Sequence, residues 1–200
     1  MPHLRVALIG SVCLVALGLA SRGVAKDWPQ WCGSDGKNMV SDETGLPATF
    51  EPGVKRSKER TVDPATARGV KWGVKICDAL YSSPAVVGDR VFVGGVESRE
   101  GVFVCLDAST GRQLWRWKAP PRDFPAAVNG FQLGIHGIPA MMGVCSSAAV
   151  QGNRLWFVTN RFDVVCLDAA GHTSGPDAGK AREIWRMDMY DKLGVFPCDA

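Results

Sequence analysis

The 200-residue sequence lacks the spacings that mark several common classes of site. It has no C-x-x-C pair, so zinc ribbons, thioredoxin-like redox centres and c-type haem attachment are without their minimal motif. Histidine occurs only three times, and positive charge is in small excess, with a net charge of +3. That charge falls to +1 without residues 1–25, which hold two arginines and no acids. The composition therefore excludes an electrostatic nucleic-acid binder.

Long apolar runs are also missing, with one exception near the start. Arg5 precedes the apolar residues 6–20, and the small residues 23–25 precede polar Lys26. This pattern is typical of a secretory signal peptide over residues 1–25, cleaved after Ala25. The alternative is a retained membrane anchor, but the run is shorter than the roughly 20 residues needed to span a bilayer. We expect an exported protein, periplasmic or extracellular, with no stable membrane span after cleavage.

Six of the seven cysteines follow residue 25. Disulfides can form in an exported chain, but the sequence does not choose among the possible pairings. Cys105 and Cys166 occupy equivalent positions in the repeat described next. That equivalence favours two small buried apolar side chains over two partners in one bond.

An internal repeat is the main feature that the sequence does contain. Two similar stretches each pass through a Cys-Leu-Asp-Ala tetrapeptide to a Trp-Arg pair, in residues 82–116 and 146–186. Trp72 and Trp115 are 43 residues apart, the size of a four-stranded propeller blade, whereas Trp115 and Trp185 are 70 apart. The extra length lies in connections, because the expected strands keep their lengths.

Apolar residues alternate with a period of two through the first unit, which predicts strands. The turn dipeptide Gly88-Asp89 predicts a hairpin, and the whole unit predicts an antiparallel meander. Residues 26–69 are instead rich in glycine, proline and short polar residues, so we expect an irregular leader that Trp28 and Trp31 anchor to a neighbouring surface. The expected strands are 70–77, 85–87, 90–93, 102–106 and 113–117.

The turn after the third strand of the meander carries the most specific residues. The carboxylate of Asp107 can accept hydrogen bonds from backbone N–H groups, and Gly111 can adopt a left-handed conformation. Turn formation thus explains Asp107 better than a role as acid or base. In the second unit only Asp168-Ala169 and Trp185 persist, since Gly171 and an inserted loop replace Thr-Gly. The second unit is therefore interpreted as a degraded copy.

Residues 106–115 resemble the pyrroloquinoline-quinone-type (PQQ-like) propeller repeat. Its hallmark is Asp, then Thr-Gly three and four residues later, then Trp at the eighth, matched here by Asp107, Thr110, Gly111 and Trp115. The resemblance implies an all-β fold, a β-propeller of four-stranded antiparallel blades. Within 70–200 it is expected as an incomplete N-terminal fragment of about two blades, 70–118 and 145–189. It also implies that Trp72, Trp115 and Trp185 pack between neighbouring blades.

The resemblance leaves the function open between two branches of the family. Quinone-dependent dehydrogenases hold pyrroloquinoline quinone and calcium in the central channel, whereas scaffolds similar to the BamB-type assembly factor bind no quinone. Neither a set of calcium ligands nor a carboxylate base is recognisable here, and the adjacent cysteine pair of many such dehydrogenases is absent. We expect a non-catalytic scaffold that binds protein partners or a small ligand at the propeller face. The alternatives are the N-terminal part of a PQQ-dependent alcohol or sugar dehydrogenase and a carbohydrate-binding module.

Few other residues are candidates for a site. His136 lies in the longest insertion, 119–144, and no second His, Cys or acid stands at ligand spacing beside it. Arg161, Asp163 and Asp168 fall close together in the second unit. They are candidates for a functional cluster or for a structural ion pair.

Overall fold

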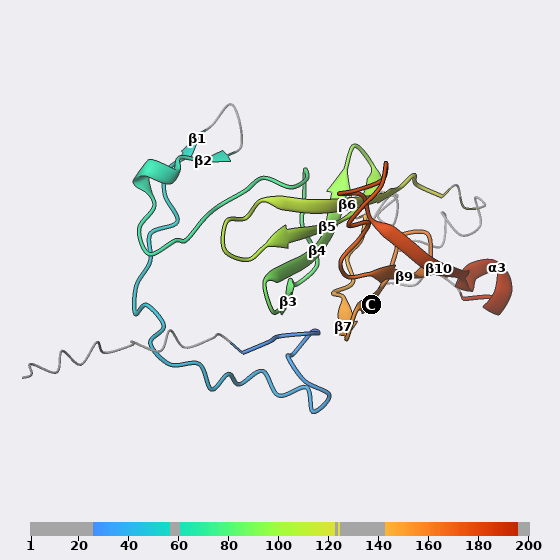
Figure 1. Cartoon of the computed structure of the whole chain (residues 1–200), viewed down its shortest axis with the longest axis horizontal. Coiled ribbons are helices and arrows are strands. Elements are labelled where there is room, and N and C mark those ends of the chain that lie inside the picture. Colours follow the sequence, from blue (N-terminus) through green and yellow to red (C-terminus); the bar gives the residue numbers. More distant parts are fainter. Residues whose placement is uncertain (1–25, 57–60, 123, 125–142, 196–200) are drawn as a thin grey trace, which may run out of the picture.

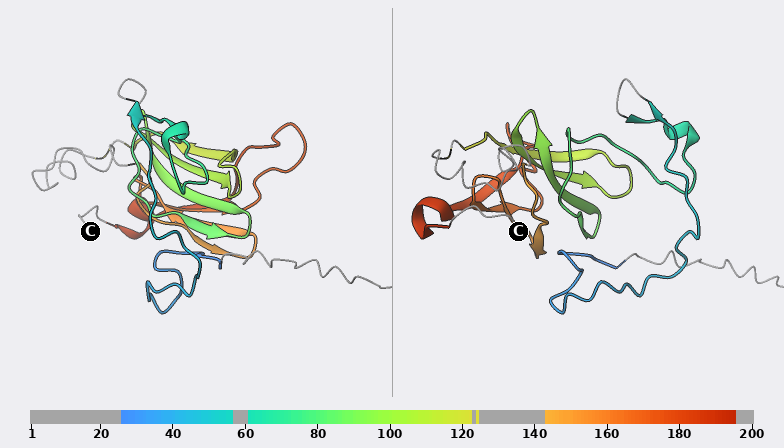
Figure 2. Two further views of the ribbon diagram at one scale, coloured as in Figure 1. Left: turned by 90° about the vertical axis from the view of Figure 1, so that its left-hand side faces the viewer. Right: turned by 180° about the vertical axis from the view of Figure 1, so that it is seen from behind.

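The computed structural model describes residues 26–56, 61–122, 124 and 143–195. In this part of the chain two four-stranded antiparallel sheets lie face to face, and the leader curls round one side of them (Figures 1 and 2). One short α-helix, α3 (Met189–Leu193), follows the last strand. The prediction of an all-β fold with four-stranded antiparallel blades is confirmed.

The first sheet is the predicted meander, with strand order β3-β4-β5-β6. Its inner strands are longer than predicted because β4 continues through two glycines. A Cβ atom on Gly94 would lie 2.7 Å from Val144 Cγ1, and one on Gly95 would lie 2.5 Å from Cys77 Sγ. Bare backbone at these two positions lets neighbouring segments pack onto the strand. The strands are β3 (Ala85–Val87), β4 (Arg90–Glu97), β5 (Glu100–Asp107) and β6 (Gln113–Ala119).

The second sheet repeats this order, with β10-β9-β8-β7 as neighbours. A register shift between Glu183 and Trp185 interrupts the pairing of its last two strands. The side chain of Asp188 caps α3 by accepting a hydrogen bond from the Asp191 N–H group. The strands are β7 (Ala149–Gln151), β8 (Arg154–Val158), β9 (Asp163–Asp168) and β10 (Arg182–Asp188).

The main core lies between the two sheets. Phe103 and Phe157 stack with ring centroids 4.1 Å apart, and Trp117 meets Phe157 edge-on at 5.1 Å. Alternate residues of both sheets point into this layer, as the period of two requires. Its fully buried side chains include Phe92, Phe103, Trp115, Leu155, Val165 and Leu167.

The opposite face of the first sheet is covered by residues 70–77. Trp72 and Ile76 pack there against Val93, Val104 and Leu106. The predicted strand over 70–77 is wrong, because no strand of the described residues lies beside this segment and Val74 is 47% exposed. Alternating apolar residues place Trp72 and Ile76 on one side, but a strand also needs a hydrogen-bonded neighbour.

The leader holds little regular structure. It contains a two-stranded ribbon of β1 (Lys55–Arg56) and β2 (Thr61–Val62), followed by the 3-10 turn η1 (Pro64–Thr66). Residues 1–25, predicted to be a signal peptide, and His136 lie outside the described residues. Among the residues that are described, none belongs to a helix long and apolar enough to cross a membrane.

Candidate functional site

Asp107 organises the turn between β5 and β6. Its Oδ1 accepts hydrogen bonds from the N–H groups of Ser109 and Thr110 at 3.0 and 2.8 Å, and from both hydroxyl groups. The two hydroxyl groups and the backbone donors lower the pKa of Asp107 to about 2. The chain returns at Gly111, whose φ is +73° and whose N–H group donates to Asp107 O. Oδ1 of this carboxylate thus serves as the acceptor that forms the turn.

The turn after β9, residues 168–171, is built like the turn between β5 and β6 but is one residue shorter. Asp168 Oδ1 accepts from the Ala170 N–H group at 2.9 Å, and Gly171 N donates to Asp168 O at 3.0 Å. Gly171 has a φ of +68°, as Gly111 has +73°. The interpretation that only Asp168-Ala169 and Trp185 persist in the second unit is therefore incomplete. Gly171 replaces the missing Thr-Gly. Its role depends on where it lies in the folded turn, and it does not depend on the number of residues that separate it from Asp168.

Each of these two turns receives a tryptophan from the preceding segment, so we call residues 107–111 and 168–171 docking turns. Trp72 Nε1 donates to Ala108 O at 3.0 Å, and Trp115 Nε1 donates to Ala169 O at 3.1 Å. In both cases the acceptor carbonyl belongs to the residue after the turn aspartate. The two contacts are equivalent, although Trp72 is half-buried and Trp115 is 1% exposed.

The glycine of each docking turn makes room for the indole. A Cβ atom on Gly111 would lie 2.7 Å from Trp72 Cδ2, and one on Gly171 would lie 2.6 Å from Trp115 Cδ1. Real Cβ atoms do not approach that closely, so any side chain there would push the ring away. Trp115 joins the two sheets through this contact, whereas Trp72 attaches residues 70–77 to the first sheet.

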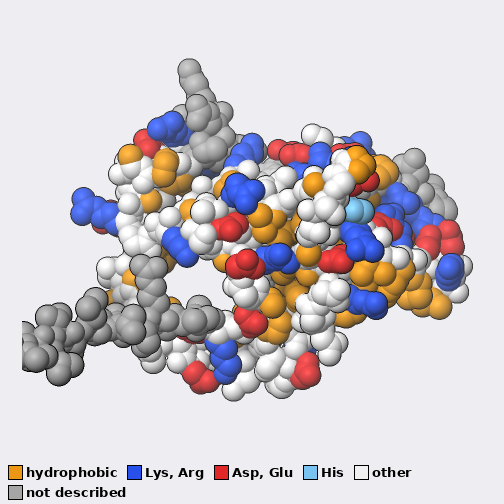
Figure 3. Space-filling model, in the orientation of Figure 1, with side chains coloured by type: hydrophobic (Ala, Val, Ile, Leu, Met, Phe, Trp, Pro, Cys, Tyr) orange, Lys and Arg blue, Asp and Glu red, His pale blue; other side chains and the backbone are white. Residues whose placement is uncertain are grey.

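Trp185 is the third repeat tryptophan, and no docking turn among the described residues receives it. It is 41% exposed, and its neighbour Ile184 is 39% exposed. On the first sheet the corresponding cross-strand partners are buried, since Phe92 and Trp115 both face Cys105 and the second sheet. Apolar side chains gather over β9 and β10 in Figure 3. Within the part of the chain that the structure describes, the far face of the second sheet is thus apolar and partly exposed at Ile184 and Trp185.

One serine fixes each sheet in a way that the repeat did not predict. Ser82 Oγ donates to Gly94 O and accepts from Gly94 N, both at 2.8 Å. Ser146 Oγ makes the same pair of bonds with Val158, at 2.9 and 2.7 Å. The Ser-Ser pair that they share was visible in the sequence, but only the structure shows that each serine bonds to both the N–H and the C=O group of one residue of its sheet.

Cys105 and Cys166 are completely buried and unpaired, so the prediction of small apolar side chains at this repeat position is confirmed. Burial raises the pKa of the Cys105 thiol to about 12 and also raises the pKa of Cys166. Both sulfur atoms are therefore protonated near neutral pH and poorly nucleophilic.

The structure pairs two of the three charged candidates of the second unit, Arg161 and Asp163, and places Asp168 apart from them. Asp163, at the start of β9, is buried and lies 3.2 Å from Arg161 Nε and 3.5 Å from Arg186 NH1. Asp168 stands at the other end of β9, where Arg182 approaches it at 3.6 Å. Arg161 also donates to Pro120 O at 3.1 Å. The Arg161–Asp163 pair thus ties the second sheet to the end of β6.

A second ion pair holds the start of the long insertion. Arg122 contacts Asp188 and Asp191, each at 2.7 Å, and its guanidinium lies 4.7 Å from the centre of the Tyr190 ring. A hydrogen bond from the Asp191 N–H group, and then the contact with Arg122, lower the pKa of Asp188. These contacts fix the chain just before the residues that carry His136.

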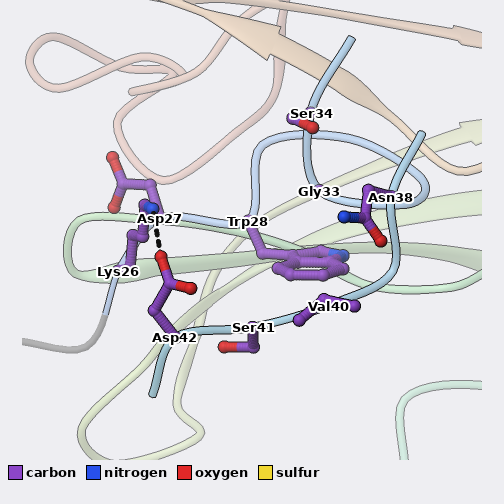
Figure 4. Close-up of a pocket in the computed structure, with 9 residues that line it drawn as sticks. All are labelled: Lys26, Asp27, Trp28, Gly33, Ser34, Asn38, Val40, Ser41 and Asp42. Carbon is purple, nitrogen blue, oxygen red and sulfur yellow. Dashed lines mark hydrogen bonds and ion pairs between the residues drawn. The ribbon is translucent and has the colours of Figure 1, made fainter. Parts of the chain in front are cut away.

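Two cavities lie beside the leader. The larger, of about 480 Å³, runs along residues 70–80 and under η1. The smaller, of about 100 Å³, surrounds the indole of Trp28, which Gly33, Asn38 and Val40 enclose (Figure 4). Lys26 and Asp42 close its edge with an exposed ion pair of 3.2 Å. Both cavities are open at the surface. The walls of the larger are mostly apolar side chains, whereas polar and charged residues line most of the smaller.

No group of three or more His, Cys, Asp or Glu side chains that could hold a metal ion occurs within the described ranges. What the repeat residues do instead is form turns, join sheets and leave one apolar face open.

Comparisons with known proteins agree with the repeat architecture. The family model described as outer membrane protein assembly factor BamB matches residues 60–189. Quinohemoprotein alcohol dehydrogenase ADH IIB of Pseudomonas putida is 29% identical over 143 residues, which are 66% of this chain and 19% of that protein.

Among solved structures, the quinohemoprotein alcohol dehydrogenase of Comamonas testosteroni gives a TM-score of 0.45 at 16% identity, covering 83% of this chain and 20% of its own. A europium-containing methanol dehydrogenase gives a TM-score of 0.35 at 18% identity, covering 55% of this chain and 16% of its own. The chain spans about a fifth of the length of the dehydrogenases that it matches.

Proposed function

The chain belongs to the family described as outer membrane protein assembly factor BamB, and on that premise we propose that it is an exported, non-catalytic scaffold for binding or assembly. One observation carries this proposal. Asp107, Gly111 and Trp115 are used to turn the chain and join the sheets, while the apolar face around Trp185 is left open. An exposed apolar patch of this kind is what a protein partner covers.

The partner expected at this face is a polypeptide rather than a nucleic acid. Ile184 and Trp185 supply apolar area, and aromatic side chains contribute strongly at protein interfaces. A small ligand at the propeller face is the other kind of partner that the fold accommodates. The signal-peptide pattern of residues 1–25 supports a periplasmic or extracellular location, as does the family's description as an outer membrane protein assembly factor.

The second candidate is the N-terminal part of a PQQ-dependent alcohol or sugar dehydrogenase. The 29% identity with quinohemoprotein alcohol dehydrogenase ADH IIB favours it. Such an enzyme would bind pyrroloquinoline quinone and calcium. The described residues do not fit a calcium site, because the buried acid Asp163 is already paired with Arg161 and Arg186 and no cluster of donors surrounds it. No catalytic step is therefore assigned to them.

A reconstitution assay separates the two candidates. The full chain is incubated with pyrroloquinoline quinone and calcium, and dye reduction is followed with alcohols and sugars as substrates. A scaffold gives no cofactor-dependent reduction. Dye reduction that requires the quinone would overturn the scaffold proposal, and saccharide binding without turnover would favour a carbohydrate-binding module.

A crosslinking experiment tests the binding face directly. A photo-reactive residue is introduced at Ile184 in the open face, and a control is introduced at Thr173 in the exposed loop 172–179. We expect an adduct with one defined polypeptide at position 184 only. Equal labelling at both positions would contradict a specific binding face.

A further inference from the structure

The first strands of the two sheets share a neighbour that comes from far upstream. β3 and β7 each stand at the end of their sheet's strand order, so each has one edge that no strand of its own sheet covers. Residues 27–29, which we call the strap, lie along both of these edges, below β3 and β7 in Figure 1.

The strap bonds to equivalent positions of the two sheets. Trp28 N donates to Val86 O at 2.7 Å, and Val86 N donates to Trp28 O at 2.9 Å, which makes an antiparallel bridge. The next residue, Pro29, accepts from Val150 N at 2.8 Å. Val86 and Val150 are the middle residues of β3 and β7. Two consecutive strap residues therefore satisfy the same backbone position in both repeat units.

A third contact involves a side chain. Asp27 Oδ1 accepts from the Gly88 N–H group at 2.7 Å. Gly88 forms the tight turn between β3 and β4, with a φ of +57°. Its N–H group is left for an external acceptor, and a carboxylate is a strong one.

Each residue of the strap suits the bond that it makes with β3, β7 or the turn after β3. Proline has no N–H group, and only the carbonyl of Pro29 is used. The residue before a proline is held in extended backbone, as strand addition requires. The ring of Trp28 turns back into the leader, against Gly33 (Figure 4), so the middle position is not recognised by the strands.

We propose that the free edges of β3 and β7 form a composite strand-addition site for an extended Asp-x-Pro segment, and that the strap is the ligand resident in it. Occupation of the site ties the two sheets together at their edge strands β3 and β7. The same edges bind an Asp-x-Pro peptide supplied from outside when the resident strap is weakened. This inference holds for a scaffold and for a dehydrogenase alike.

Hydrogen exchange on the full chain tests the proposal. In Asp27→Ala we expect the amides of Val86, Gly88 and Val150 to exchange about tenfold faster, as loss of a hydrogen bond to a charged group implies. The amides of Ala108 and Ala169 donate to Asp89 O and Asn153 O, so their exchange should not change. Asp27→Asn, which keeps an acceptor but no charge, should give a smaller effect on the same three amides.

The matched control is Asp35→Ala, since Asp35 accepts from Gln30 within the leader. It should leave the three amides protected. The hexapeptide Lys-Asp-Trp-Pro-Gln-Trp is then added to the Asp27→Ala chain, where it should restore protection, whereas the same peptide with Ala in place of Asp should not. Unchanged exchange in Asp27→Ala would overturn the strap. Failure of the first peptide, or equal restoration by both, would overturn recognition of Asp-x-Pro.

Discussion

Replacing Gly171 with alanine tests whether the docking turn joins the two sheets. The new Cβ atom would stand 2.6 Å from the Trp115 ring and 2.7 Å from Lys180 O, at a φ of +68°. The left-handed backbone costs a non-glycine residue about 1–2 kcal/mol. Overpacking a filled site adds about 1–3 kcal/mol. We expect Gly171→Ala to lower the free energy of unfolding by about 2–5 kcal/mol.

Gly152→Ala is the matched control for the backbone effect. Gly152 has a φ of +59° in the turn between β7 and β8, but no atom lies within 4 Å of its added Cβ. It bears the conformational cost alone, so the two variants should differ by the packing contribution of about 1–3 kcal/mol. Gly111→Ala at the first docking turn and Gly88→Ala in the turn between β3 and β4 form a second such pair. There the difference should be smaller, because Trp72 is less buried than Trp115.

Urea unfolding of the full chain, followed by circular dichroism and tryptophan fluorescence, measures these differences. With a slope of about 2 kcal/mol per molar urea, the midpoints of Gly171→Ala and Gly152→Ala should differ by about 0.5–1.5 M. The fluorescence of native Gly171→Ala should also shift to longer wavelength, since Trp115 is forced from its buried site. Equal midpoints for the two variants would refute the claim that this glycine serves Trp115.

Four further predictions concern Asp107, Trp115, Trp185 and the two buried thiols. Because the pKa of Asp107 is lowered to about 2, its contribution to stability is present above about pH 4 and is lost as the pH falls toward 2. Between about pH 5 and 2 the urea midpoint should therefore fall less steeply in Asp107→Asn than in the unchanged chain. Identical pH profiles of the two proteins would contradict this. Trp115→Phe leaves the buried Ala169 carbonyl unpaired and should cost about 1–3 kcal/mol. Trp185→Phe should change stability by less than about 0.5 kcal/mol, and a larger loss there would show that its face is already covered. The buried thiols of Cys105 and Cys166 should resist alkylation of the native chain at pH 8 and react after denaturation, as mass spectrometry can check.

The docking turns were predictable because their signals are local. Asp107 and Gly111 satisfy the hydrogen-bonding and conformational needs of one turn within five residues of sequence. Gly171 was missed because fixed spacing from Asp168 was taken as the criterion. A turn shortened by one residue still places its glycine beneath the tryptophan, and only the three-dimensional contact reveals it.

Residues 70–77 show what an alternation of apolar residues with a period of two cannot predict. The pattern correctly groups Trp72 with Ile76 on one side. It says nothing about whether a neighbouring strand exists, and without one the segment packs by its side chains alone. Hydrogen-bonded neighbours are supplied by residues far along the chain, so the alternation of a single segment cannot specify them.

The strap was hidden from sequence analysis for a related reason. Three of its four hydrogen bonds use backbone groups, which every residue other than proline offers equally. Trp28 was expected to anchor the leader through its ring. Its main chain instead holds the edge strand β3, while its ring packs against Gly33 within the leader.

The contact between Trp115 and its docking turn is directional, and this has an evolutionary consequence. Each unit presents a tryptophan on one face of its sheet and a glycine turn on the other, so two copies joined in tandem always bring unlike faces together. A duplicated unit inherits both halves of the contact and needs no new interface to be accommodated. Gene duplication can therefore lengthen such an array by whole units, while each copy remains free to diverge in its connections, as the insertions 119–144 and 172–179 have done here.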